Sequence, residues 1–226
     1  MSVSQSLKDQ LDRGLDALAA MGLAGIDQST RGQLLGFVGL LAKWNRVYNL
    51  TAVRDPQEMV TRHLLDSLVL SPWLPGAATN PADVSDRTDV LDIGTGAGLP
   101  VLPLAIVHPE LSFKSVESNG KKARFQQQAL LELGLANVQI EQKRIEDVNA
   151  QARFVTSRAF TAPVDFLRIA EPLCAKNGLV AIMLGLAERL PDALPEPFVL
   201  QQLVKVDVPN TESARHVALC RRSEPL

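Results

Sequence analysis

Apolar residues recur at helical spacing in two stretches near the start of the chain. Residues 31–44 place Leu34, Leu35, Val38 and Leu41 on one helical face, and residues 57–70 repeat the pattern with apolar residues such as Leu64 and Leu68. The first 75 residues are therefore predicted to form a small helical region. The following residues 75–89 are rich in Pro, Ala, Asp and Thr, which is typical of an exposed loop and a boundary.

From residue 89 onward, short apolar runs alternate with helical patterns. Strands are predicted at 89–93, 112–117, 137–142, 153–158 and 178–184, with helices near 102–110, at 120–134 and near 164–175. This alternation is typical of a parallel sheet with helices on both faces. Two last strands, within 198–208 and 215–222, are separated by a loop too short for a crossover helix. They are expected to pair antiparallel at one edge.

The predicted fold is thus α/β, with a seven-stranded, mostly parallel sheet and an N-terminal helical extension. Its predicted parts are a helical region at 1–75, a loop at 76–88 and a sheet domain at 89–226. We expect these parts to form one compact unit.

Composition narrows the functional classes. The 226 residues carry 46% hydrophobic and 21% charged residues and a net charge of −2, which indicates a globular protein rather than a nonspecific nucleic-acid coat. No apolar run is long enough for a membrane span, and the start lacks the apolar core of a signal peptide. Cys174 and Cys220 lie far apart and form neither a CxxC motif nor a zinc spacing. We therefore expect a cytoplasmic protein without a metal site.

The stretch LDIGTGAGLP at residues 91–100 is the strongest chemical signal. Gly94, Gly96 and Gly98, here called the glycine loop together with the residues between them, follow the first strand at its carboxyl end. Open α/β sheets bind ligands at that edge, and glycines let a ligand approach the backbone. Dinucleotide enzymes favour a small residue where this chain has Leu99. An acid, one residue and then G-x-G-x-G, as in Asp92 followed by the glycines, instead favours S-adenosylmethionine.

Two further strand ends match a nucleoside cofactor. Glu117 ends the second strand, 21 residues after Gly96, where a carboxylate can accept both ribose hydroxyls. The third strand is followed by Arg144, Ile145, Glu146 and Asp147. In an S-adenosylmethionine enzyme this loop closes over the adenine. A tight strand–helix connection without a ligand remains open as an alternative, as does a dinucleotide site.

Five stretches together resemble the bacterial small-subunit rRNA methyltransferase G family, also known as the glucose-inhibited division protein B family. They are KWNRVYNLTAVRDP (43–56), RHLLDSL (62–68), LDIGTGAGLP (91–100), GKKARF (120–125) and SRAF (157–160). The resemblance implies a class I S-adenosylmethionine-dependent, Rossmann-like methyltransferase fold with an N-terminal helical extension. It also implies methyl transfer to N7 of one guanine in 16S rRNA.

The residues that match the family motif imply a cofactor site. Gly94, Leu99, the pair Ile145–Glu146 and Arg158 are expected around S-adenosylmethionine, with Glu117 on the ribose. Together with the acid and glycines of the motif, the predicted cofactor-binding set is Asp92, Gly94, Gly96, Gly98, Leu99, Glu117, Ile145, Glu146 and Arg158.

The chain departs from the family pattern at three places. Val101 stands where a glycine often follows GLP, and Arg153-Phe154 stand where an FD pair is common. Leu184 stands where a lysine is expected at the end of the fifth strand.

The chemistry of guanine N7 agrees with the residues after the fourth strand. N7 is a neutral lone pair, so no base has to remove a proton, and catalysis requires in-line placement. Residues 157–160 read SRAF rather than the DPPY-like motif of exocyclic-amine methyltransferases. Arg158 is predicted to be catalytic by orienting the base next to the cofactor, with a surface ion pair as the alternative.

Other polar and aromatic residues favour structural roles. Phe160 is expected in the core, although it could stack on an extruded base. His63 is expected to form a hydrogen bond to Asp66 on a helix, with a substrate-site role as the alternative. Asn49 and Thr51 are expected to cap or turn a helix, and the helical region is expected to pack over the sheet's carboxyl edge.

Charge favours a modest RNA-binding face. Residues 112–158 hold eight cations against five acids; the cations are Lys114, Lys121, Lys122, Arg124, Lys143, Arg144, Arg153 and Arg158. The expected partner is 16S rRNA or the small ribosomal subunit, bound by a monomer, with no role for DNA or a membrane. Three alternatives remain: a class I methyltransferase with another substrate, a non-catalytic cofactor-sensing assembly factor, and an NAD-type oxidoreductase.

Overall fold

The computed structural model describes residues 3–23, 25–76, 88–158, 160–211 and 214–223. Seven strands form one sheet with the order β3-β2-β1-β4-β5-β7-β6. The strands are β1 (Thr88–Ile93), β2 (Phe113–Val116), β3 (Val138–Glu141), β4 (Ala152–Arg158), β5 (Cys174–Leu184), β6 (Phe198–Val206) and β7 (Arg215–Arg222). The helices are α1 (Val3–Ala19), α2 (Gln28–Tyr48), α3 (Pro56–Met59), α4 (Asp66–Leu68), α5 (Val101–Val107), α6 (Gly120–Leu133) and α7 (Pro163–Ala170). Short 3₁₀ turns lie at Ser71–Trp73, Ile145–Asp147 and Ala187–Arg189.

Strand directions confirm the predicted topology. Strands β1 to β5 pair in parallel, and β7 pairs antiparallel with both β5 and β6 at one edge. Strand β1 lies in the middle of the parallel part, where Leu91 pairs with Lys114 of β2 on one side and with Val155 of β4 on the other. All six residues of β1 are buried, as expected for a strand covered on both faces. Because parallel strands end at one edge, the turns after β1, β2 and β4 lie next to each other.

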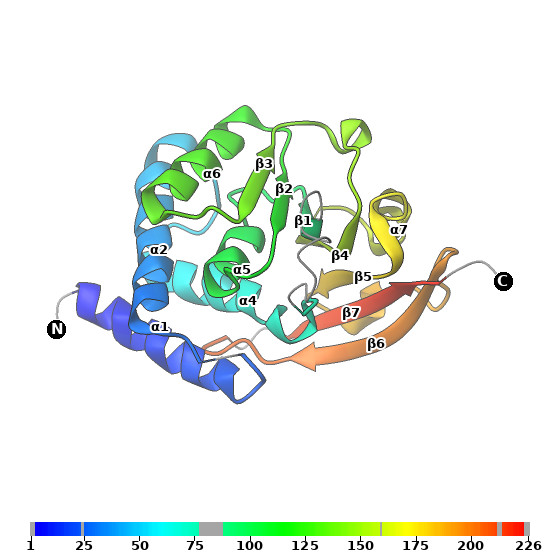
Figure 1. The fold of residues 1–226 in the computed structure, drawn as a ribbon. Coiled ribbons are helices and arrows are strands. Elements are labelled where there is room, and N and C mark those ends of the chain that lie inside the picture. Colours follow the sequence, from blue (N-terminus) through cyan, green and yellow to red (C-terminus); the bar gives the residue numbers. More distant parts are fainter. Residues whose placement is uncertain (1–2, 24, 77–87, 159, 212–213, 224–226) are drawn as a thin grey trace.

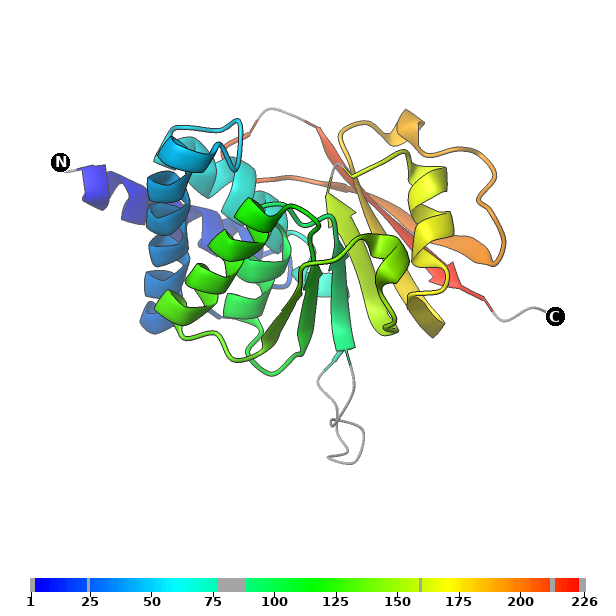
Figure 2. The same cartoon turned by 90° about the horizontal axis from the view of Figure 1, so that it is seen from above.

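Helices cover the two faces of the sheet unequally. Helices α1, α2, α5 and α6 lie on one side and α7 lies on the other (Figure 1), and the view from above separates the two layers (Figure 2). One apolar cluster contains residues of the extension, such as Phe37 and Leu64, together with sheet-domain residues such as Phe125 and Phe154. A second cluster lies between α7 and the other face of the sheet. The N-terminal helices therefore share a core with the sheet.

Local sequence explains where α2 and α6 begin and end. Asp27 caps α2 by accepting from the Thr30 N–H at 2.8 Å, and Asn49 ends it in the left-handed region. Asn119 caps α6 by accepting from the N–H groups of Lys121 and Lys122, and Gly134 ends it at φ +67°. Asn49 is thus a helix cap, as predicted.

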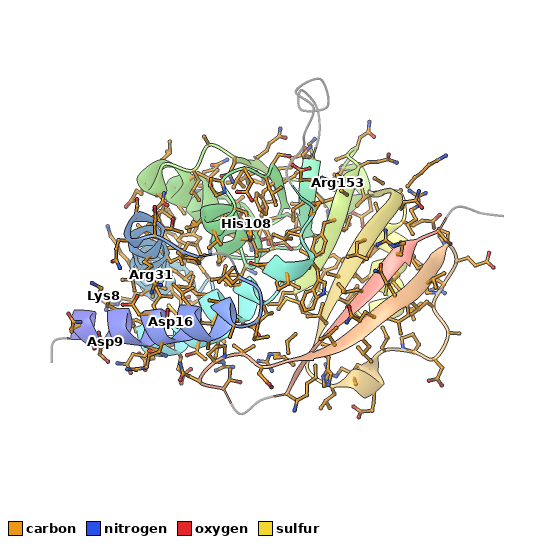
Figure 3. All side chains as sticks on the ribbon, turned by 60° about the horizontal axis from the view of Figure 1, so that its bottom comes forward. Lys8, Asp9, Asp16, Arg31, His108 and Arg153 are labelled. Carbon is orange, nitrogen blue, oxygen red and sulfur yellow. The ribbon has the colours of Figure 1, made fainter. Side chains whose placement is uncertain are left out.

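An ion pair fastens α1 to α2. Arg31 of α2 lies 2.6 Å from Asp12 and 3.5 Å from Asp16 of α1, and Figure 3 shows Arg31 and Asp16 close together. Asp16 is largely exposed, so the pair with Asp12 carries most of the interaction.

Several predicted boundaries are wrong by a few residues. Strand β1 begins at Thr88, inside the predicted loop, while residues 77–87 lie outside the described residues. The helix predicted near 164–175 ends at Ala170, because Cys174 already pairs with Ala152 in the sheet. The predicted helix 57–70 is divided by a π-helical turn, Val60–Leu65, between α3 and α4. Such turns depend on tertiary packing, which periodicity does not register.

In the described part of the chain, no helix combines the length and apolarity that crossing a membrane requires.

We predict that Phe37→Ala destabilises the extension and the sheet together. Phe37 is fully buried, and its ring lies 6.1 Å from that of Phe125 on α6. Removing it is expected to lower the free energy of unfolding by about 3 to 5 kcal/mol in one cooperative transition. Urea unfolding followed by tryptophan fluorescence, which reports Trp44 and Trp73 of the extension, and by circular dichroism tests this. Two separated transitions would contradict a single unit.

Candidate active site

The glycine loop turns sharply at the carboxyl end of β1. Gly94, Gly96 and Gly98 have φ values of +65°, +63° and +79°, in the left-handed region that side chains disfavour. The Gly96 N–H donates to a Glu117 carboxylate oxygen at 2.8 Å, and the other oxygen accepts from the Asn119 N–H at 2.7 Å. The space that a Cβ on Gly96 would fill is open, with only the Lys122 ammonium nearby at 3.8 Å. Glu117 thus connects the carboxyl end of β2 to the loop that follows β1.

Buried polar groups on the core side of the glycine loop stabilise it through hydrogen bonds. Gln126 of α6 donates to the Gly96 carbonyl at 2.8 Å and accepts from the Ser115 hydroxyl at 2.6 Å. Asp92 is fully buried and accepts from the Val101 N–H at 3.3 Å. Burial raises the pKa of Asp92 to about 8, so its carboxyl group is mainly neutral at pH 7. Asp92 therefore supports the loop and the start of α5.

Two cavities open on either side of Gly94. The larger, about 450 Å³, lies between the glycine loop, the extension and the ends of β4 and β5. Gly94, Gly96, Leu99 and Arg158 line it. The smaller, about 170 Å³, is lined by Gly94, Ile145 and Glu146, together with residues that include Ser118. Seven of the nine predicted cofactor residues therefore meet here, counting Glu117 through its bond to Gly96.

The remaining two predicted residues lie outside both cavities. Asp92 is under the loop, and a Cβ on Gly98 would clash with Leu102 of α5 rather than face a cavity. Asp92 and Gly98 therefore contribute to the conformation of the glycine loop but line neither cavity.

Phe160 lies where the cavities meet. Its side chain is 41% exposed, so the expectation that it belongs to the core is wrong. A Cβ on Gly94 would overlap the Phe160 ring, which also lines the smaller cavity. A further cavity of about 580 Å³, between α7 and the end of β5, is also lined by Phe160 and shares Leu184 with the larger one. Phe160 therefore forms a partition beside the glycine loop.

Asp66 of α4 brings two distant cations to the larger cavity. It lies 3.2 Å from Arg158 Nη1 and 2.9 Å from Arg215 Nε, at the end of β4 and the start of β7. Arg158 Nη1 also donates to the Arg62 carbonyl at 2.9 Å. Asp66 is only 5% exposed, and a buried carboxylate requires such partners. Arg158 is thus ion-paired, as one alternative predicted, and it also lines the cavity, the position that the predicted catalytic role requires.

His63 occupies the π-helical turn beside this ion pair. Its Nδ1 lies 2.9 Å from the Arg62 carbonyl, which can only accept, so Nδ1 carries the proton. Its Nε2 then accepts from the Thr51 hydroxyl at 2.8 Å. The predicted bond from His63 to Asp66 is therefore wrong, because Asp66 faces the two arginines. Burial and then the charge of Arg158 lower the pKa of His63 to about 4, so the ring is neutral at pH 7.

The extension lines the cavity, as predicted, through residues on two segments. Thr51 follows α2, and its N–H donates to buried Asn45 at 2.9 Å, while Asn45 donates to the Val53 carbonyl. His63 and Asp66 lie on the second segment. Arg215 was missed by the sequence analysis, because its partner is 149 residues away and no local pattern signals the pairing.

Among the residues that the structure describes, three of the eight cations counted in the predicted basic face, besides Arg158, lie beside acids. Lys114 pairs with Glu141 at 2.9 Å and Lys143 approaches the same carboxylate at 3.4 Å. Arg153 donates to the Gly76 carbonyl and pairs with Asp89 at the opposite end of the strands; Figure 3 labels it. Lys122 and Arg158 do reach the larger cavity. The Arg153 departure from the family pattern thus lies away from the cavities, whereas Leu184 lines two of them.

Among the described residues, no group of three or more His, Cys, Asp or Glu side chains could hold a metal ion. Cys174 and Cys220 are both buried free thiols.

Comparison with known sequences gives one family. The family described as rRNA small subunit methyltransferase G matches residues 30–218. A protein named ribosomal RNA small subunit methyltransferase G from Azoarcus sp. (strain BH72) is 43% identical over 213 residues, covering 92% of this chain and 94% of the relative. One of the same name from Nitrosospira multiformis is 39% identical over 219 residues, covering 92% and 95%.

Comparison with solved structures gives the fold. Magnesium protoporphyrin IX methyltransferase from Synechocystis PCC 6803, with bound SAM, matches with a TM-score of 0.54 at 16% identity, covering 88% of this chain and 99% of that chain. TrmN from Thermus thermophilus matches with a TM-score of 0.54 at 18% identity, covering 72% and 53%. The chain thus has the α/β fold of class I methyltransferases.

We predict that His63 makes stability depend on pH between about 4 and 6.5. The unfolded chain protonates His63 near its ordinary pKa of 6.5, whereas the folded chain resists protonation until about pH 4. In that window the unfolded state binds more protons, so acidification favours unfolding. From pH 7 to pH 5, the parent is expected to lose about 2 kcal/mol more than His63→Gln does.

Urea unfolding of both proteins at the two pH values measures this difference. Both retain His108 and Asp92, whose contributions cancel in the comparison. Equal losses in parent and variant would show that His63 is protonated as easily in the folded state as in the unfolded one.

Proposed function

The chain belongs to the rRNA small subunit methyltransferase G family, and on that premise we propose that it transfers the methyl group of S-adenosylmethionine to N7 of a guanine in 16S rRNA. The observation that carries the proposal is the meeting of the open glycine loop, the Glu117 carboxylate and Arg158 at one edge of the sheet. The helical extension encloses that edge.

The two cavities fit the parts of this cofactor. Each Glu117 oxygen accepts one backbone N–H and keeps lone pairs that can accept ribose hydroxyls. Ile145 offers an apolar surface and Glu146 a polar edge in the smaller cavity, which suits adenine. Gly96 leaves open backbone on the side of the larger cavity, which suits the amino-acid portion. When bound, S-adenosylmethionine supplies an electrophilic methyl group on a positively charged sulfur.

Phe160 has to move for one ligand to span both cavities. Its ring covers Gly94, the residue that both cavities share. The side chain is partly exposed, so rotation toward solvent breaks few contacts. The ring would then be available beside the entering guanine.

The charges at the larger cavity suit a nucleophile that needs no deprotonation. Guanine N7 attacks through a neutral lone pair, so positioning is the main requirement. The buried groups nearest the cavity are unsuited to act as bases, because His63 has a pKa of about 4 and holds both ring nitrogens in hydrogen bonds. Asp66 is committed to two arginines. The site therefore orients its substrate rather than removing a proton from it.

Arg158 is the residue best placed to orient the base. A guanidinium carries five N–H donors in a planar fork, and the Nη1 contacts to Asp66 and the Arg62 carbonyl leave donors for a ligand. A donor directed at O6 accepts guanine and rejects adenine, which presents an amino group there. Contact at O6 also leaves N7 free. We propose Arg158 as the catalytic residue that places N7 before the methyl group.

We propose a cytoplasmic location for the protein, because ribosomal RNA is the proposed substrate. We propose that it acts there as a monomer on 16S rRNA or the small ribosomal subunit, with no requirement for a membrane or for DNA.

Gly96→Asp is predicted to abolish cofactor binding. The new carboxylate would enter the open space beside the loop, and the left-handed backbone at φ +63° strains any side chain there. Calorimetry with S-adenosylmethionine is expected to detect binding to the parent and none to the variant. Gly32→Asp, at an exposed glycine near the start of α2 with open space around it, is the matched control. Unchanged affinity in Gly96→Asp would refute the position of the pocket.

Arg158→Ala is predicted to slow methyl transfer about a hundredfold or more, because a positioned donor is lost. Transfer of labelled methyl groups to purified small ribosomal subunits, with large subunits as a negative control, measures this and tests the proposed function in the parent. Arg158→Lys keeps the charge near Asp66 but removes the planar fork. It is expected to fold like the parent and to transfer slowly. Parental rates in both variants would remove Arg158 from the site.

A further inference from the structure

An exposed ring stack lies beside the larger cavity. Tyr48 at the end of α2 stacks on Trp44 with ring centroids 5.2 Å apart, and Trp44 contacts the buried ring of Phe125 at 5.8 Å. Tyr48 is the chain's single tyrosine and is 44% exposed, although Phe125 is fully buried. The three rings therefore form a column of contacts from the core to the surface, tilted by 35° between Trp44 and Tyr48 and edge-on between Trp44 and Phe125, with the partly exposed Tyr48 ring at its outer end.

The surroundings of this column are strongly basic. Residues 43–54 and 118–131 lie on segments that pack together through Trp44 and Phe125. Neither range contains an acid, and Asp55, Glu117 and Glu132 lie at their ends. The two ranges carry six of the 23 lysines and arginines: Lys43, Arg46, Arg54, Lys121, Lys122 and Arg124. In the described part of the chain, none of these six forms a salt bridge to an acid. For a protein with a net charge of −2, this is a marked local concentration of unpaired cations.

The column and its cations continue into the cavity. Leu50 and Thr51, two and three residues after Tyr48, line the larger cavity, as does Lys122. Figures 1 and 2 both show α2 and α6 side by side. Tyr48 and the six cations on these two packed segments are here called the aromatic–basic surface. A polyanion that delivers one group to Arg158 would reach this surface from the cavity rim at Thr51 and Lys122.

We propose that the aromatic–basic surface binds single-stranded rRNA, with one base next to the target guanine stacked on Tyr48. The inference rests on the proposed function and specifies where the flanking strand lies. A guanine can enter the cavity only after leaving its own stack, which exposes the faces of its neighbours. An aromatic ring accepts any base face, while unpaired cations bind the phosphates between the bases. Tyr48 thus replaces the stacking that the flanking base loses.

Tyr48→Ala tests this contact. Purified small subunits from cells that lack the enzyme serve as RNA, and filter binding in the presence of S-adenosylhomocysteine measures affinity without turnover. The variant is expected to bind about tenfold more weakly and to show a KM raised by a similar factor, with kcat within about twofold of the parent. Tyr48→Phe keeps the ring and is expected to restore both values.

Two controls separate stacking from folding. Val47→Ala changes the neighbouring residue, which is 70% exposed, and is expected to behave like the parent. Tyr48→Leu keeps apolar cover over Trp44 without a π-face, and is expected to bind RNA as weakly as Tyr48→Ala while folding normally. Calorimetry with S-adenosylmethionine verifies that each variant retains its cofactor site.

The outcomes distinguish this inference from the proposed function. Parental affinity and KM in Tyr48→Ala would overturn the stacking contact and leave the methyltransferase intact; the surface would then suit an acidic protein instead. Equal defects in Tyr48→Phe and Tyr48→Ala would also overturn it, because the hydroxyl rather than the ring would matter. A parent that binds subunits but transfers no methyl group would overturn the proposed function, while the binding measurement would still test Tyr48.

Discussion

The pairing of buried Asp66 with Arg158 and Arg215 is the interaction on which the site depends. It joins the helical extension to the ends of β4 and β7, across 92 and 149 residues of sequence. A carboxylate that is 5% exposed would be strongly destabilising without such partners. Asp66 holds Arg158 at the cavity, and burial together with the charge of Arg158 keeps His63 neutral. Arg158 therefore has its position at the cavity because the buried charge of Asp66 must be neutralised.

This arrangement explains how a site can be catalytic although His63 and Asp66, the buried groups at its larger cavity, are held by hydrogen bonds and ion pairs. The glycine loop, fixed by Glu117 above and Gln126 below, gives open backbone on one side of the cavity. The extension gives Arg158 a fixed position on the other side. A neutral nucleophile such as guanine N7 requires only a fixed distance between the glycine loop and Arg158. The apolar core shared by the extension and the sheet fixes that distance. Binding of the flanking RNA to the aromatic–basic surface extends the same positioning beyond the cavity.

Sequence patterns predicted the sheet and the edge hairpin, because strands depend on local periodicity. The glycine motif and the family resemblance together selected nine cofactor candidates, seven of which the fold brings to the two cavities. Sequence patterns did not predict the side-chain contacts between residues that are far apart in the sequence. Arg215 has no local signal, and His63 was assigned to Asp66 because helical spacing placed them together. The π-helical turn and the two arginines changed that pairing. Phe160 was expected in the core from its residue type. Because Gly94 has no side chain, the Phe160 ring instead lies over the glycine loop, where it is partly exposed.

The most direct measurement of the central claim is the identity of the methylated atom. Small ribosomal subunits from cells without this protein are incubated with the protein and S-adenosylmethionine, and the 16S rRNA is digested and analysed by mass spectrometry. A site that orients a neutral lone pair predicts one new N7-methylguanosine at a single position. Methylation at an exocyclic amine or at a pyrimidine carbon, both of which involve the loss of a proton from the base, would contradict the account.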